Sequence, residues 1–207
     1  SEVYALEAFA PATGPLASHG VVFVRFTLAA GTAGTMSVNT DPDPTLRFND
    51  HRLINVAGET VAWFDAGWKW ERGRAVGKLT PRSHLVLAIA TKALPSDLKA
   101  DFNYDAERAA TGAYWNELLD RGMRLTVPEA RINHAARNLI IQNHMLTKGD
   151  RLHYSAGNQY DQLYEAEGSD AMLALLAWGH VADARRLIPA LLDFSRKGLE
   201  NHQASFK

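Results

Sequence analysis

The sequence contains no cysteine, which excludes disulfide frameworks, zinc–thiolate sites and thiol nucleophiles. It also lacks an excess of either charge, because 22 basic residues stand against 23 acidic ones. Binding to nucleic acid or to an anionic membrane needs clustered positive charge, so we expect neither as a partner. Long apolar runs are missing as well: a run such as 85–90 is far shorter than the roughly 20 residues that cross a bilayer.

Common catalytic and cofactor signatures are also absent. The chain has no GxSxG elbow, no P-loop, no GxGxxG and no HExxH pattern, so esterase, nucleotide and zinc-protease functions lack support. Its eight histidines form no ligand spacing: His134 and His144 are ten residues apart and point about 80° away from each other on one predicted helix. We therefore predict neither a metal site nor a cofactor.

Residues 1–96 have the periodicity of β-strands. Val22 to Leu28 alternate between two faces, and the segments 46–48, 61–64 and 84–90 are rich in β-branched or aromatic residues. Clusters of glycine, proline and aspartate separate these segments. Short strands with such punctuation predict an antiparallel β-sandwich.

After a linker and linker helix over 97–127, the period changes to that of helices, and a helical domain is predicted over 128–207. The predicted helices are 105–121, one that starts at Pro128, 169–178 and 181–196, with Gly122, Gly179 and Gly198 as stops. Pro189 predicts a kink or a late start in the last of them. The expected fold is thus a β-sandwich followed by helices.

The connection over 147–168 is unusually long for a link between helices. It is too aromatic for a disordered segment, so we expect an ordered loop with a function. Aromatic rings and carboxylates side by side suit sugars, whose C–H faces stack while their hydroxyls bind acid oxygens. The candidate sugar-binding residues are Tyr160, Tyr164, Glu165, Glu167 and Asp170, with Ser169 as the N-cap of the next helix.

A solvated acidic loop is the plain alternative, because a carboxylate in a first helical turn needs no ligand. Glu165 and Glu167 are also candidates for the acid and base of glycoside hydrolysis, which needs two carboxyl groups about 5 to 9.5 Å apart. Proximity in the sequence does not establish that geometry.

The second half resembles the start of the six-hairpin (α/α)6 toroid of glycoside hydrolases, the group of glucoamylases, trehalases and processing α-glucosidases. The matching segments are Trp115–Leu119, Val127–Glu129, the helix 132–146, Ala156–Tyr160, Ser169–Asp170, Leu173–Gly179 with Ala182–Ala184, and His202–Lys207 as the opening of a further inner helix. In that group a β-sandwich often precedes the toroid. The resemblance covers about residues 105–207.

The resemblance implies that loops at the N-terminal ends of inner helices line a sugar pocket, with Asp170 on the hydroxyls of the sugar at the cleaved bond. Many relatives have Arg-Asp where this chain has Ser169-Asp170. The general acid and base of relatives come from later hairpins, which we expect beyond Lys207. Six hairpins of roughly 45 residues make a ring of roughly 270, so we expect the rest of the helical domain, or a complementing chain, as a partner.

Two other classes of function stay open. One is a non-catalytic carbohydrate-binding protein that uses Trp63, Trp68 and Trp70 as a stacking platform, although tryptophan in a sandwich is more often core. The other is a sugar phosphorylase or polysaccharide lyase of similar architecture. The residues favour neither an extracellular nor a cytoplasmic location.

Overall fold

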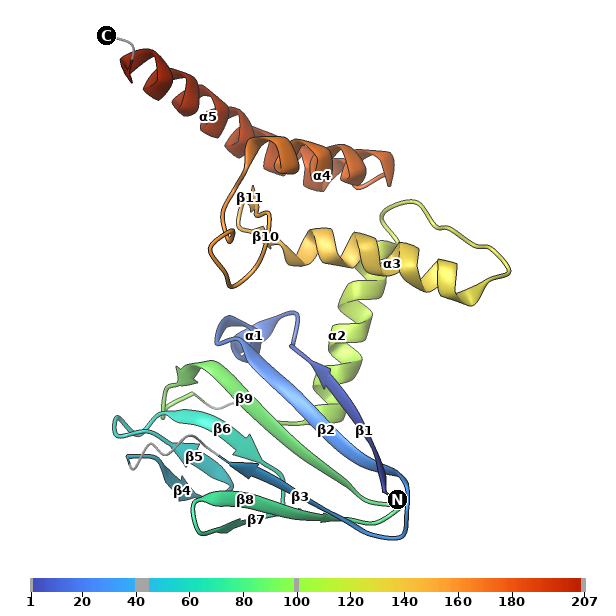
Figure 1. Ribbon diagram of the computed structural model, residues 1–207, viewed down its shortest axis with the longest axis vertical. Coiled ribbons are helices and arrows are strands. Elements are labelled where there is room, and N and C mark those ends of the chain that lie inside the picture. The colour runs from blue at the N-terminus through green and yellow to red at the C-terminus, as the bar shows by residue number, and fades with distance from the viewer. Residues whose placement is uncertain (1, 40–44, 99–100, 206–207) are drawn as a thin grey trace. The chain divides into compact units, whose positions relative to one another are not determined.

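The computed structural model describes residues 2–39, 45–98 and 101–205 and shows antiparallel sheets followed by helices (Figure 1). The predicted order of β and then α is confirmed. The chain divides into two compact units, Ser1–Tyr114 and Trp115–Lys207.

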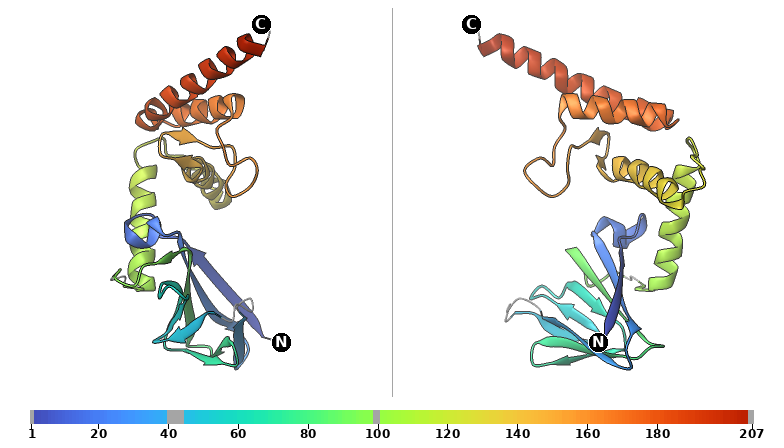
Figure 2. Two further views of the ribbon diagram at one scale, coloured as in Figure 1. Left: turned by 90° about the vertical axis from the view of Figure 1, so that its left-hand side faces the viewer. Right: turned by 45° about the vertical axis from the view of Figure 1, so that its right-hand side comes forward.

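The first unit contains two antiparallel sheets (Figure 1, Figure 2). The six-stranded sheet has the order β1-β2-β9-β6-β5-β4 and the three-stranded sheet the order β3-β8-β7. The strands are β1 Val3–Phe9, β2 Val21–Ala30, β3 Gly34–Asn39, β4 Arg47–Asn49, β5 Arg52–Ile54, β6 Thr60–Phe64, β7 Trp68–Glu71, β8 Arg74–Leu79 and β9 His84–Leu94. The four predicted strands correspond to β2, β4, β6 and β9, whereas β1, β3, β5, β7 and β8 were not predicted.

The six-stranded sheet is covered on both faces. Alternate residues of β9 belong to different cores: Leu85 and Leu87 pack with residues of the three-stranded sheet, while Val86 and Ala88 pack with the second core. That second core includes Leu16 of the short helix α1 (Gly14–Ser18). Successive side chains of a strand point to opposite faces, so a strand buried on both faces reads as the continuous apolar run seen in the sequence.

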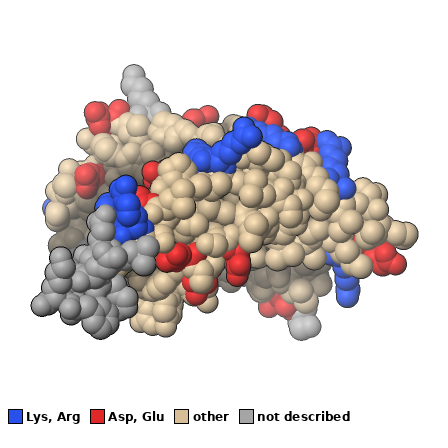
Figure 3. Space-filling view, turned by 90° about the horizontal axis from the view of Figure 1, so that it is seen from above, with Lys and Arg blue, Asp and Glu red and all other residues tan. Residues whose placement is uncertain are grey.

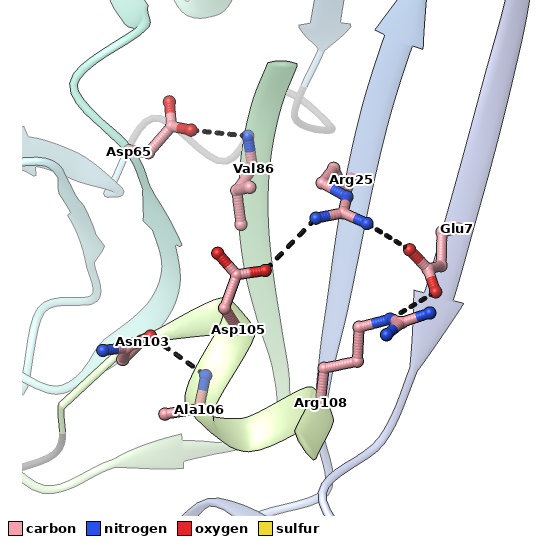
Figure 4. A network of polar contacts seen from close by, with 8 residues as sticks. All are labelled: Glu7, Arg25, Asp65, Val86, Asn103, Asp105, Ala106 and Arg108. Carbon is pink, nitrogen blue, oxygen red and sulfur yellow. Dashed lines mark hydrogen bonds and ion pairs between the residues drawn. The ribbon is translucent and has the colours of Figure 1, made fainter. Parts of the chain in front are cut away.

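Helix α2 (Tyr104–Leu119) starts at the sheet and is held there by charge (Figure 4). The side chain of Asn103 accepts the Ala106 N–H at 3.1 Å and caps the helix. Arg25 of β2 donates to Glu7 at 2.6 Å and to Asp105 at 3.2 Å, and Arg108 donates to Glu7 at 2.6 Å. The first turn of α2 is therefore tied to β1 and β2.

The second unit contains α3 (Ala130–Met145), the two-stranded hairpin β10 (Thr147–Lys148) and β11 (Arg151–Leu152), α4 (Glu165–Ala177) and α5 (Val181–Ser205). Helices α4 and α5 pack side by side in an αα-hairpin (Figure 2). Their core contains Leu152, Met172, Leu175, Ala184 and Leu187. None of the helices in the described part of the chain is long and apolar enough to span a membrane.

The turn of this hairpin follows a C-capping motif. Gly179 has a φ of 85°, and its N–H donates to the Leu176 carbonyl, while the His180 N–H donates to the Leu175 carbonyl at 2.8 Å. This is the Schellman arrangement, in which a residue without Cβ adopts the left-handed conformation. The predicted helix stop at Gly179 is thus confirmed with its mechanism.

Two predicted helix boundaries were wrong. Helix α4 begins at Glu165 rather than at Ser169, and α5, which begins at Val181 as predicted, continues past Pro189 and Gly198 to Ser205. Gly198 has no positive φ and is accommodated inside the helix, at a cost of roughly 1 kcal/mol relative to alanine. Residues 202–205 therefore continue α5 and open no separate helix, while Phe206 and Lys207 lie outside the described residues.

Candidate functional site

The long connection between α3 and α4 is anchored by Asp161. Its carboxylate accepts hydrogen bonds from Lys148 Nζ at 2.5 Å, from the Gly157 N–H at 3.1 Å and, at 2.7 Å, pairs with His153 Nδ1. The hydrogen bond from Lys148, with those from His153 and Gly157, holds the pKa of Asp161 well below its usual range. One carboxylate thus ties the β10–β11 hairpin to the loop that follows it.

Three tyrosines of this loop form an aromatic cluster. The ring centroids of Tyr154 lie 5.9 Å from Tyr160 and 5.8 Å from Tyr164, and those of Tyr160 and Tyr164 lie 6.3 Å apart. Edge-to-face pairs at such distances stabilise each other. Tyr154 and Tyr160 remain 49% and 45% exposed. We call these three residues the tyrosine cluster; it presents ring surface to solvent.

The start of α4 adjoins the tyrosine cluster, because Tyr164 is the N-cap residue of that helix. Glu165 and Glu167 stand in the first turn, where the helix dipole favours negative charge. Asp170 lies in the second turn instead of the first, and the Ser169 hydroxyl donates back to the Glu165 carbonyl at 2.7 Å. The prediction of Ser169 as an N-cap was therefore wrong.

The predicted acidic residues divide between two sides of α4. Glu167 and Asp170 are three residues apart, which makes them neighbours on the helix surface, and both are exposed. Glu165 lies on another side, where its carboxylate accepts a hydrogen bond from the Ser195 hydroxyl of α5 at 2.8 Å. Glu165 thus braces the α4–α5 hairpin, while Glu167 and Asp170 face solvent together.

Among the five predicted site residues, Tyr160 and Tyr164 lie together in the structure. Glu167 and Asp170 are neighbours on the surface of α4. The predicted loop was recognised by its length and aromatic content. Its anchor was missed, because the partners Lys148 and His153 precede Asp161 by 13 and 8 residues and follow no known motif. A salt bridge across a loop leaves no periodic trace in a sequence.

The three tryptophans of the β unit pack against its cores. Trp68 is only 3% exposed, and its indole N–H donates to the Val86 carbonyl at 2.8 Å. The rings of Trp63 and Trp70 stack on Phe102 and Phe48, with centroids 5.3 Å and 5.0 Å apart. The expected core role is confirmed for Trp68, which offers no platform to a sugar.

A second group of polar side chains was not predicted, because His144 was compared only with His134. In the structure His144, in the last turn of α3, lies beside His180 and Asp183, which follow helix α4 in the sequence. Two residues at the ends of different helices share no sequence period, so no helical pattern could have paired them. These three residues are the ones that could hold a metal among those described.

No family model, no curated protein and no solved structure matches the chain.

Proposed function

We propose that the chain is part of a glycoside hydrolase, with its sheets as a β-sandwich domain and its helices as the first hairpins of an (α/α)6 toroid. In this proposal the tyrosine cluster and the exposed acidic side of α4 form part of the sugar-binding site. The observation that carries it is the exposed tyrosine cluster, held in place by Asp161 beside an acidic helix N-terminus.

The chemistry of the two groups suits a carbohydrate. Exposed tyrosine rings offer flat apolar surface for the C–H faces of a sugar and hydroxyls for its polar edge. Carboxylates such as Glu167 and Asp170 accept hydrogen bonds from sugar hydroxyls, and such charge-assisted bonds are strong. In this assignment Asp170 and the tyrosines bind substrate, and the general acid and base come from hairpins outside residues 1–207.

Uncovered apolar surface in the second unit supports the idea of further hairpins. The second half of α4, residues 171–177, contains only apolar residues, yet Leu173 is 63% exposed. Ile132 and Leu139 stand seven residues apart on one stripe of α3, and both are exposed. A helix that is apolar nearly all round is normally buried. The remaining hairpins, or a complementing chain, would cover these side chains.

Oligosaccharide binding tests the site. Tyr160→Ala and Asp170→Ala should each weaken binding of a recognised oligosaccharide by about tenfold or more, about 1.4 kcal/mol, in isothermal titration calorimetry. Tyr4→Ala is the matched control, because Tyr4 is an exposed tyrosine of the other unit. Equal losses in the control and the site variants, or no binding by the wild type across a broad oligosaccharide panel, would contradict the proposal.

Product analysis on the full-length protein tests the reaction. Hydrolysis without phosphate supports a glycosidase, whereas a phosphate-dependent sugar phosphate would identify a phosphorylase and an unsaturated product a lyase. Either of the last two outcomes would overturn the assigned reaction and leave the binding site in place.

A further inference from the structure

Three side chains with metal-binding atoms converge between α3 and α5. His144 lies in the last turn of α3, His180 directly precedes α5, and Asp183 lies in its first turn. One potential ligand atom from each lies within 4.8 Å of the other two. His180 and Asp183 are three residues apart, so that they share one side of the chain, with 4.0 Å between Nδ1 and Oδ2.

The two imidazoles are buried without hydrogen-bond partners. The side chain of His180 has no exposed surface, and neither of its nitrogens is bonded to any described residue. The same holds for Nε2 of His144, whose ring lies 4.9 Å from that of His180. An unsatisfied buried polar group costs about 1 to 3 kcal/mol, and buried polar groups are nearly always paired. Three such nitrogens together point to a ligand.

The surroundings leave specific atoms available. A Cβ on Gly122 would lie 2.5 Å from Nε2 of His180, so this edge of the ring is packed against backbone and Nδ1 is the nitrogen near Asp183. On Asp183, Oδ1 lies 3.7 Å from the Arg186 guanidinium, whereas Oδ2 lies toward His180. An arginine on the outer oxygen orients a carboxylate in the way that second-shell partners orient metal ligands.

We propose that His144, His180 and Asp183 bind a divalent cation of the zinc class. Two imidazoles and one carboxylate are ligands that zinc accepts, whereas magnesium and calcium require oxygen donors. Zinc–ligand distances of about 2.0–2.2 Å place tetrahedral ligands roughly 3.4 Å apart. The potential ligand atoms lie within 4.8 Å of one another, so the side chains would draw together when the ion binds. This proposal does not depend on the proposed sugar site.

The position of the ligands suggests what the ion does. His144 and His180 bracket the whole α3–α4 connection and helix α4, including the tyrosine cluster. A metal held by both would join the two ends of this segment and link the end of α3 to the α4–α5 hairpin. Three protein ligands leave the fourth tetrahedral position to water. Because metal that binds only the folded chain stabilises it, the ion would also add to the stability of this segment.

Titration with Co²⁺, followed by visible absorption, tests the site in the whole chain. We expect one equivalent to give the d–d bands of a tetrahedral nitrogen–oxygen site, Zn²⁺ to displace it, and Mg²⁺ to have no effect. His144→Gln and Asp183→Asn should weaken Zn²⁺ binding at least tenfold in calorimetry. His134→Gln is the matched control on the same helix, where His134 is exposed, and should bind as the wild type does.

Circular dichroism of each variant shows whether it is folded. If a variant fails to fold, X-ray absorption of the wild-type Zn²⁺ complex decides: two imidazoles and one carboxylate in the first shell support the site. Absence of one-to-one binding by the wild type, or equal binding by folded His144→Gln, would overturn the proposal and leave a neutral histidine pair in a packed interior.

Discussion

At the scale of single residues, Asp161 decides the order of the candidate sugar loop. Asp161→Asn keeps the shape of the side chain but removes the charge that Lys148 and His153 bind. We expect faster amide hydrogen exchange and proteolysis within 153–164, with little change in the global melting temperature, because local opening needs no global unfolding. Asp170→Asn is the control, since Asp170 lies in α4 and no described residue bonds its side chain. Unchanged amide exchange in Asp161→Asn would show that this carboxylate does not anchor the loop.

Two glycines, Gly112 within α2 and Gly122 just after it, should respond oppositely to substitution by alanine. Gly122→Ala would place Cβ 2.5 Å from both His180 Nε2 and the Trp178 carbonyl oxygen, so we expect a loss of about 1 to 3 kcal/mol in the free energy of unfolding. Gly112→Ala meets no atom within 4 Å inside the helix and should stabilise by roughly 0.5–1 kcal/mol. Denaturant unfolding measures both. Two equal effects of the same sign would contradict the packing described at His180.

At the scale of elements, charge joins the start of α2 to β1 and β2 (Figure 4). The hydrogen bond from Arg108, aided by Arg25, lowers the pKa of Glu7 below its ordinary value. A lowered carboxyl pKa contributes stability that is fully present above the ordinary value of about 4.5 and disappears as pH falls through the folded-state value. Glu7 is 38% exposed, so screening limits this contribution to less than about 1 kcal/mol.

Glu7→Gln tests this attachment. The variant should be less stable than the wild type at pH 7 by up to about 1 kcal/mol, and the difference should shrink between pH 5 and pH 3. Glu117→Gln is the control, because Glu117 of α2 pairs with Arg121 just after that helix and both side chains are exposed. A difference that stays constant over this pH range would mean that the charge of Glu7 has no part in the effect.

Sequence periodicity predicted those elements whose own residues carry a pattern. Strands β2 and β9 were predicted from the alternation of β2 and the apolar run of β9, because each pattern repeats along a single strand. Strands β3, β7 and β8 were missed although their burial alternates, because they have only six, four and six residues and so short an alternation gives little signal in a sequence. In the candidate site, Tyr160 and Tyr164 were predictable from a long aromatic loop. Asp161 and the pair His144–His180 were not, since both depend on contacts between residues far apart in the sequence.

At the scale of the whole molecule, the helices of the second unit leave large apolar side chains uncovered. Leu139, Leu173 and Leu192 are each more than half exposed, although their unit has a buried core around Leu175 and Leu187. Figure 3 shows a broad area without Lys, Arg, Asp or Glu on one face of the described residues. Large apolar side chains that are exposed together mark a contact surface.

The exposed leucines therefore predict self-association of this chain in the absence of further hairpins. Leu139→Lys and Leu173→Lys should reduce dye binding in an anilinonaphthalene sulfonate assay and raise the monomer fraction in analytical ultracentrifugation, because each places charge within the apolar surface. Val56→Lys is the control: Val56 is 81% exposed at a turn of the β unit and lies outside that surface. If the wild type stays monomeric and binds no dye, the leucines are ordinary surface residues, and the case for additional covering helices loses its support. If the leucine variants alone become monomeric, the apolar faces of α3 and α4 are contact surfaces that a larger helical ring would bury.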